Sequence, residues 1–245
     1  MLTRMVSSGL LAGVIAGLCV TVIETRTTVP LILEAERYET ARHDHAWGDA
    51  VDGARVVLAH SHGTSGAHPE FAQAPGVQRI AFSAVATIGA AVGFALMLLA
   101  VMLASGAGIT ARSGALWGAA GFVAAGLAPA FGLAPALPGS AEIDLVSRQL
   151  WWIATATATA AGLWGLWRWR TAGPVIACLA LISLPHLAGA PGEHQYASMV
   201  PAELAAHFTA TSLAVQAILW GLVGALSGAA WGWLEPGNPS ARSPA

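Results

Sequence analysis

Residues 6–23 read VSSGLLAGVIAGLCVTVI, a run with no charged side chain. About 20 apolar residues in a helix cross the hydrocarbon core of a bilayer, which is roughly 30 Å thick, so this run predicts a membrane-spanning helix. Arg4 before the run is also typical of a signal peptide, but no clear small-x-small cleavage site follows, which favours an uncleaved span. Gly9, Gly13 and Gly17 lie four residues apart on one helix face, which predicts close packing against another helix.

The rest of the chain has the same oily composition. Of its 245 residues, 56% are hydrophobic and only 10% are charged, whereas soluble domains carry about 25% charged residues. Long apolar runs recur to the end of the chain. We therefore predict an all-α polytopic membrane protein, a helical bundle of six transmembrane segments with five as the alternative.

We expect one transmembrane domain over residues 1–234, followed by a disordered tail at 235–245. The expected spans cover about 5–33, 79–104, 114–133, 150–167, 173–188 and 208–234. Pro30 should kink or end the first helix, before a long polar loop rich in His and Asp at 34–78. Glycines four residues apart recur at 89 and 93 and at 224, 228 and 232, and predict further close helix contacts.

Charge placement predicts the orientation of the bundle. With six spans, the two termini and the two short connections share one side, which carries Arg4, Arg112, Arg168, Arg170 and Arg242 against the single acid Glu235. Short cytoplasmic loops favour Arg and Lys, so we expect both termini in the cytoplasm. The His-rich loop would then face outward.

Five of the eight histidines lie between residues 43 and 68. His43 and His45 form one His-x-His pair, and His60 and His62 form another. Imidazole is a common ligand of divalent transition metals, and acids nearby could complete a site. The spacing matches no structural zinc motif. Two interpretations stay open: a chelating loop that captures metal weakly, or a solvated loop with incidental histidines.

Three acids border this loop on its N-terminal side. Glu34 and Glu36, just past the first span, could form the mouth of a cation path, or only a polar helix end. Glu24 is close to the membrane itself. An ionisable group at such a depth predicts a place on a transport path, although its side chain could instead reach the interface.

A second group of candidate metal ligands lies late in the chain. His186 follows Pro185 at the end of a span, where a helix break can free carbonyl groups for ion coordination. His194 and then Glu203 and His207 follow in the next connection. Glu203 and His207 are four residues apart, so on a helix they would share a face and could hold one divalent ion. The alternative for each histidine is a hydrogen-bonded imidazole at the interface.

Several functions lack their sequence signatures. The chain has no P-loop, HExxH motif, dinucleotide fingerprint or GxSxG with plausible partners, so we predict neither ATP hydrolysis nor an enzyme. The net charge of −2 gives no basic signature of nucleic-acid binding. Cys19 and Cys178 lie inside apolar runs and predict buried packing residues.

Short blocks in a fixed order carry a resemblance to a known family. The blocks LILEAERYE, APALPG, RQLWW, PHLAGAP and VPAELAAHF, followed by a glycine-bearing last span, resemble CbtA, a family of predicted cobalt transporter subunits. The likeness covers nearly the whole chain outside residues 40–75. It departs from the family pattern at Ala136, where an acid is usual, and the family is usually described with five spans.

The resemblance implies a component of a cobalt uptake system in the bacterial inner membrane, linked to cobalamin synthesis. It also implies a small single-span partner with a His-rich motif, CbtB, and leaves a homo-oligomer open. Cobalt or another divalent transition metal would be the transported ion, with no tightly bound cofactor. The second hypothesis is a non-transporting membrane scaffold that docks a partner through its glycine-lined helices.

Overall fold

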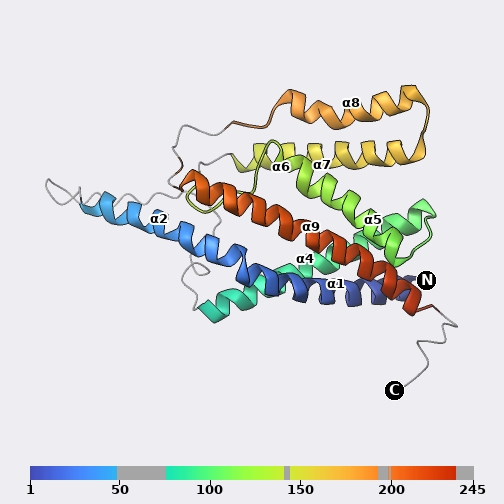
Figure 1. The fold of residues 1–245 in the computed structure, drawn as a ribbon, viewed down its shortest axis with the longest axis horizontal. Helices are drawn as coiled ribbons and strands as arrows, with labels where there is room; N and C mark the ends of the chain where they lie inside the picture. Colours follow the sequence, from blue (N-terminus) through green and yellow to red (C-terminus); the bar gives the residue numbers. More distant parts are fainter. Residues whose placement is uncertain (49–75, 141–143, 193–197, 199, 236–245) are drawn as a thin grey trace, which may run out of the picture.

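The computed structural model describes residues 1–48, 76–140, 144–192, 198 and 200–235, and within these residues the regular structure is entirely helical. The helices, with bounds and labels as in Figure 1, are α1 (Leu2–Arg26), α2 (Thr28–Gly48), α4 (Gly76–Ser105), α5 (Ala111–Phe122), the π-helical turn η1 (Val123–Leu127), α6 (Ala128–Ala130), α7 (Leu145–Arg168), α8 (Ala172–Ala188) and α9 (Ala202–Trp233).

Successive helices run back and forth between two ends of the molecule (Figure 1). One end, here called the terminal end, holds the N-terminus and the end of α9. The Arg4 side chain donates to the carbonyl of Trp231, stacks 4.2 Å above its ring and lies 3.6 Å from the carboxylate of Glu235. The short α4–α5 and α7–α8 connections lie at the same end. The ends of α2, α6 and α8 and the starts of α4, α7 and α9 lie towards the opposite end, here called the loop end (Figure 1).

Close packing of α1, α4, α5 and α9 forms the core. A side chain at Gly17 would meet the Ile88 Cα of α4 at 2.6 Å, and Gly13 similarly faces the backbone of Val92. Gly224 and Gly228 of α9 face the backbone of Gly114 and Thr110, beside α5. Because the glycines have no Cβ, the helix backbones can approach closely. The buried residues between them are small or aliphatic, such as Ala12, Ala91, Ala95, Leu98, Met102 and Val223.

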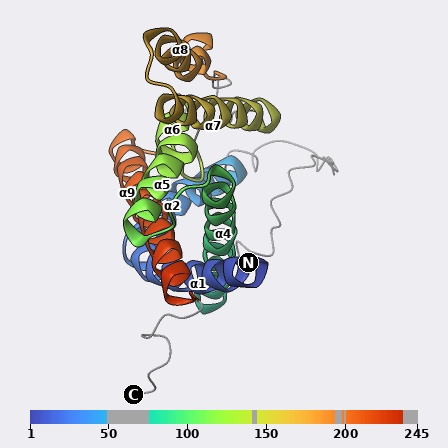
Figure 2. The same cartoon turned by 90° about the vertical axis from the view of Figure 1, so that its right-hand side faces the viewer.

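An outer layer is formed by α7 and α8. Figure 2 shows these helices stacked on one side of the four-helix core, with α7 next to it and α8 outermost. Gly162 and Gly165 of α7 lie against Cys178 and Ile182 of α8, which brings these two helices together. The α7–α8 hairpin therefore contacts the core mainly through α7, on the π-helical turn and α6.

Four of the described helical segments are long and apolar enough to cross a membrane: Leu2–Arg26, Ile80–Ser105, Ala111–Ala130 and Ala202–Trp233. The helix α8 is apolar but shorter, with 17 residues. The all-helical membrane fold agrees with the sequence prediction. The count of six spans stays a prediction. It requires that α7 and α8 also cross the membrane, in addition to these four segments.

The structure corrects the predicted loop at 34–78, because α2 continues as a helix to Gly48. Pro30 has the predicted effect nearby, since α1 ends at Arg26 and the chain bends at Thr27 (Figure 1). Proline has no N–H for the carbonyl four residues earlier, here that of Arg26. Beyond the bend the sequence LEAERYETAR is rich in strong helix formers, and these continue the helix although they are too polar to extend a membrane span.

The predicted contacts of three glycines are wrong. Among the described residues, a side chain at Gly89, Gly93 or Gly232 would meet nothing within 4 Å. The α4 face that carries Gly89 and Gly93 is exposed, whereas the opposite face of α4 packs on α1. The prediction for Cys19 is also wrong, since it is exposed on α1, while Cys178 is buried.

Candidate functional site

An acidic side chain lies between α1 and α4. Glu24 occupies the last turn of α1 and is partly buried. Its Oε2 atom accepts a hydrogen bond of 2.9 Å from the hydroxyl of Thr87 on α4. The glycine face of α1 brings the two helices close enough for this contact. Glu24 is thus a carboxylate fixed between two helices that are both candidate spans.

The depth of this carboxylate follows from the antiparallel packing of the two helices. Thr87 lies seven residues after Ile80, where the apolar part of α4 begins, which is about 10 Å along a helix axis. Glu24 therefore lies level with the apolar part of α4 rather than beyond its end. Charged groups at such a depth are costly to bury and generally mark substrate or ion pathways.

The break between α1 and α2 follows Glu24 closely in the chain. The hydroxyls of Thr25, Thr27 and Thr28 each donate to a carbonyl three or four residues earlier, at 2.7–3.3 Å. Pro30 cannot donate to the carbonyl of Arg26. Interrupted membrane helices supply ion-binding carbonyls in this way in many transporters.

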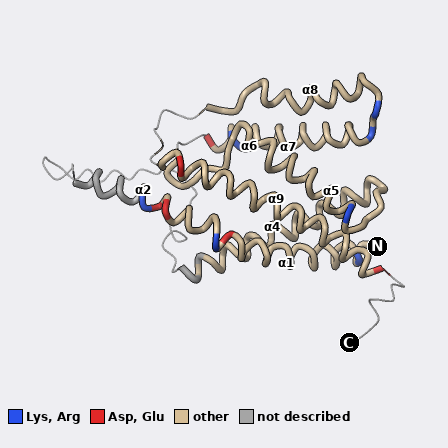
Figure 3. The backbone as a smooth tube through the Cα atoms, viewed as in Figure 1, with Lys and Arg blue, Asp and Glu red and all other residues tan. Residues whose placement is uncertain are grey.

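Glu34 and Glu36 lie further along α2, towards the loop end. Glu34 is exposed and Glu36 is partly buried. Ala35 between them is fully buried, in a cluster with Leu137 and Val200. Leu204 and Phe208 of α9 pack against this cluster. The start of α9 thus lies beside the acidic segment of α2, and Figure 3 shows acidic residues on both helices there.

Glu203 and His207 lie in the first turns of α9, not in the connection before it. Both are exposed, and they share a helix face with Ala210, Ala214 and Ile218, which are exposed as well. This face points away from the bundle. The two side chains can share one ion at the surface, but they do not face Glu24 or the interior.

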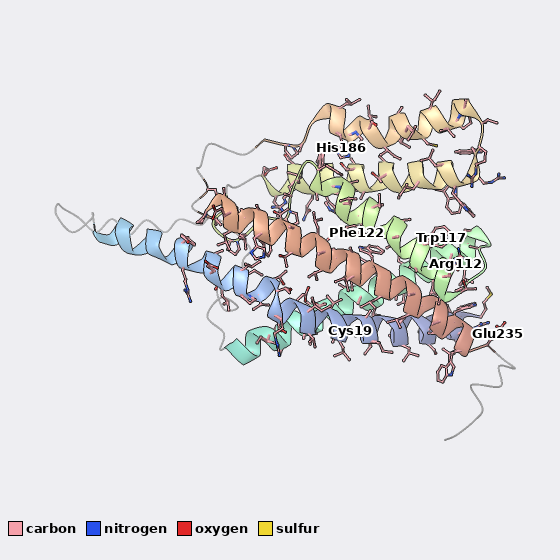
Figure 4. The ribbon with its side chains drawn as sticks, viewed as in Figure 1. Cys19, Arg112, Trp117, Phe122, His186 and Glu235 are labelled. Carbon is pink, nitrogen blue, oxygen red and sulfur yellow. The ribbon has the colours of Figure 1, made fainter. Side chains whose placement is uncertain are left out.

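His186 lies apart from these acids, in the last turn of α8 (Figure 4). Its ring makes edge-to-face contacts with Trp151 at 5.8 Å and Phe131 at 6.4 Å between centroids. It lines a largely apolar cavity of about 730 Å³ between the α7–α8 hairpin and the π-helical turn. In the part of the chain that the structure describes, its surroundings are therefore aromatic and aliphatic.

The described residues contain no group of three or more His, Cys, Asp and Glu side chains that could hold a metal ion. His43 and His45 belong to the described backbone of α2, but their side chains lie outside the description. His60, His62 and His194 lie outside the described residues. A histidine-based metal site stays a prediction for these positions.

Two polar residues of the interior were missed by the sequence predictions. Thr87 is 63 residues from its partner Glu24, so no local pattern links them. Gln216 interrupts the apolar run of α9, and this amide in a candidate span was a visible signal. A Cβ atom at Gly126 would lie 2.7 Å from the Oε1 atom of Gln216. The amide therefore packs against the π-helical turn, which contains Gly126. Such turns often occur at functional sites.

A helical bundle with four candidate membrane spans defines a class, that of polytopic membrane proteins. The chain belongs to the family described as "Probable cobalt transporter subunit (CbtA)", whose model matches residues 2–232. This match confirms the resemblance carried by the short sequence blocks, and the family description is that of a probable transporter subunit. No curated protein and no solved structure gives a significant match to the chain.

Proposed function

We propose that this protein is the membrane subunit of a divalent-metal uptake system, with cobalt as its cargo, that supplies cobalamin synthesis. The metal identity rests on the family, because imidazole and carboxylate sites bind nickel, copper and zinc at least as well as cobalt. Metal would be gathered at the loop end by His43, His45, His60, His62 and His194. From there it would pass through the membrane between the core helices.

The observation that carries this proposal is the Glu24 carboxylate, held by Thr87 at the break between α1 and α2. A carboxylate at membrane depth offsets part of the cost of bringing a cation out of water. Glu34 and Glu36, further along the same chain segment, would concentrate cations before they reach Glu24. Glu203, His207 and His186 would serve as outer ligands at the loop end.

Arginines at the terminal end support an orientation with both termini in the cytoplasm. Arg4, Arg112, Arg168 and Arg170 all belong to this end, at the start of α1, the start of α5 and the end of α7. Short cytoplasmic connections favour Arg. The loop end, with its acids and histidines, would then face outward in the inner membrane, where it could collect metal.

A partner follows from the word "subunit" in the family description. We propose a small single-span protein with a His-rich motif, which would deliver metal at the loop end. A scaffold that binds its partner through glycine faces has less support. Gly9, Gly13 and Gly17 contact α4 of the same chain, and Gly224 and Gly228 face the α5 region, so these faces are already occupied.

The decisive experiment measures uptake of labelled cobalt into membrane vesicles, with and without the small partner. We expect stimulated uptake in the wild type and at least a tenfold loss for Glu24→Gln, as is common when a metal-binding oxygen is perturbed. Glu235→Gln is the matched control, because it makes the same chemical change at the exposed terminal end. Normal uptake by Glu24→Gln would contradict the proposed path, and wild-type vesicles without cobalt flux would contradict transport altogether.

A further inference from the structure

A second cavity, of about 570 Å³, lies where the π-helical turn and α6, the start of α7, and α9 converge. Ligand cavities commonly measure about 300–1,000 Å³. Since α5–α6 and α7 run in opposite directions, Pro135 and Arg148 line its end towards the loop end, whereas Gly126, Ile153 and Gln216 line its inner end. The cavity therefore extends from a helix end into the interior of the bundle.

The outer end of this cavity is positively charged and carries hydrogen-bond donors. Arg148 and Gln149, in the first turn of α7, both line it. Arg148 is partly buried, and no described carboxylate forms a salt bridge with its guanidinium. A guanidinium group pairs well with a carboxylate or phosphate. The outer end is thus built for an anion and would repel a metal cation.

The rest of the wall is apolar and borders the membrane. Ala125, Pro129, Ala130 and Leu133 line one side, and Trp152 and Ile153 line the other. Leu145, Trp152 and Ile153 are 65%, 42% and 53% exposed. In a membrane-embedded chain such side chains face lipid. A small soluble anion would use only the outer end and would leave this apolar length without a partner.

We propose that the cavity binds an anionic phospholipid, with the phosphate on Arg148 and Gln149 and an acyl chain along the apolar wall towards Gln216. A guanidinium at the end of a membrane helix can pair with a lipid phosphate at headgroup level. The site is separate from Glu24, which lies between α1 and α4. A bound lipid here would brace the α7–α8 hairpin, which otherwise contacts the core mainly through the π-helical turn and α6.

The test uses the full chain in neutral detergent, without metal, so its outcome is independent of transport. Native mass spectrometry and thermal unfolding would be measured with phosphatidylglycerol, phosphatidylcholine or inorganic phosphate. We expect preferential binding and stabilisation by phosphatidylglycerol, with about fivefold weaker binding by Arg148→Gln, the effect typical of one basic residue near anionic lipid. Arg170→Gln, an exposed arginine at the terminal end, is the matched control and should bind as the wild type does.

A second variant tests the apolar wall without changing charge. Ala130→Leu would fill part of the cavity and should weaken lipid binding while Arg148 is intact. Equal binding of phosphatidylcholine would overturn the proposal, as would wild-type affinity in Arg148→Gln. If inorganic phosphate raised the unfolding temperature as much as phosphatidylglycerol does, and Ala130→Leu did not weaken lipid binding, the cavity would be a site for a free anion instead.

Discussion

At the scale of single residues, the contact that positions the Glu24 carboxylate is the hydrogen bond from the hydroxyl of Thr87. We expect Thr87→Val, which keeps the shape of the side chain but removes the donor, to leave the carboxylate poorly positioned. Outer groups that orient a metal ligand typically contribute 10–100-fold to metal affinity. The apparent KM for cobalt uptake in vesicles should therefore rise about tenfold, with a smaller change in maximal rate.

Thr87→Ser retains a hydroxyl and should restore most of that affinity. Thr159→Val is the control for a general packing effect, because Thr159 is also buried in a helix but its hydroxyl has no hydrogen-bond partner in the described structure. Equal KM values for Thr87→Val and Thr159→Val would mean that the hydroxyl does not position Glu24.

At the scale of helices, the glycine face of α1 sets the distance to α4. A side chain at Gly13 would place its Cβ 2.6 Å from the backbone nitrogen of Val92, which cannot move without shifting α4. We expect Gly13→Leu to destabilise the protein by at least about 1–3 kcal/mol, the usual cost of overpacking. Thermal unfolding in detergent would measure this loss.

Gly93→Leu is the matched control on the facing helix, because a side chain there meets no atom of the described residues within 4 Å. The unfolding temperature of this variant should stay close to that of the wild type. A similar loss of stability in both variants would mean that α4 has another partner on its exposed face.

The glycine spacing shows what the sequence can and cannot predict about these helices. It correctly predicted close contacts at Gly9, Gly13 and Gly17, and it was wrong for Gly89 and Gly93. Spacing alone places two glycines on one face. An apolar helix such as α4 can turn either face towards the bundle, since lipid and protein are similarly apolar. The choice depends on partners far away in the sequence.

The candidate site has the same limit. Glu24 was predicted from its depth and Pro30 from its chemistry, since both signals are local. The hydrogen bond to Thr87 and the neighbourhood of α2 and α9 join distant segments, and no local pattern encodes them. The helix at residues 34–48 was missed for another reason. Hydropathy separates membrane from water, whereas helix propensity and packing, here that of Ala35 on Leu137 and Val200, determine whether a polar segment stays helical.

At the scale of the whole molecule, the N-terminus, the end of α9 and both short connections share one end (Figure 1). Gly108, in the α4–α5 connection, and Gly192, after α8, are exposed glycines at opposite ends, and no described atom lies within 4 Å of where a side chain would begin. In a variant without Cys19 and Cys178, we expect Gly108→Cys to react with a membrane-impermeant thiol reagent only in inside-out vesicles. Gly192→Cys should react only in right-side-out vesicles. The reverse pattern would place the termini outside the cytoplasm.

This orientation gives the histidines between residues 43 and 68 an auxiliary role. They would face the outside and raise the local metal concentration, whereas we propose that Glu24 lies on the path itself. Replacing His43, His45, His60, His62 and His68 together by Gln should therefore raise the apparent KM for cobalt and leave the maximal rate of vesicle uptake nearly unchanged. A weak capture site limits uptake only when metal is scarce, because saturating metal fills the path without help. Complete loss of uptake at saturating cobalt would instead place these histidines on the obligatory route.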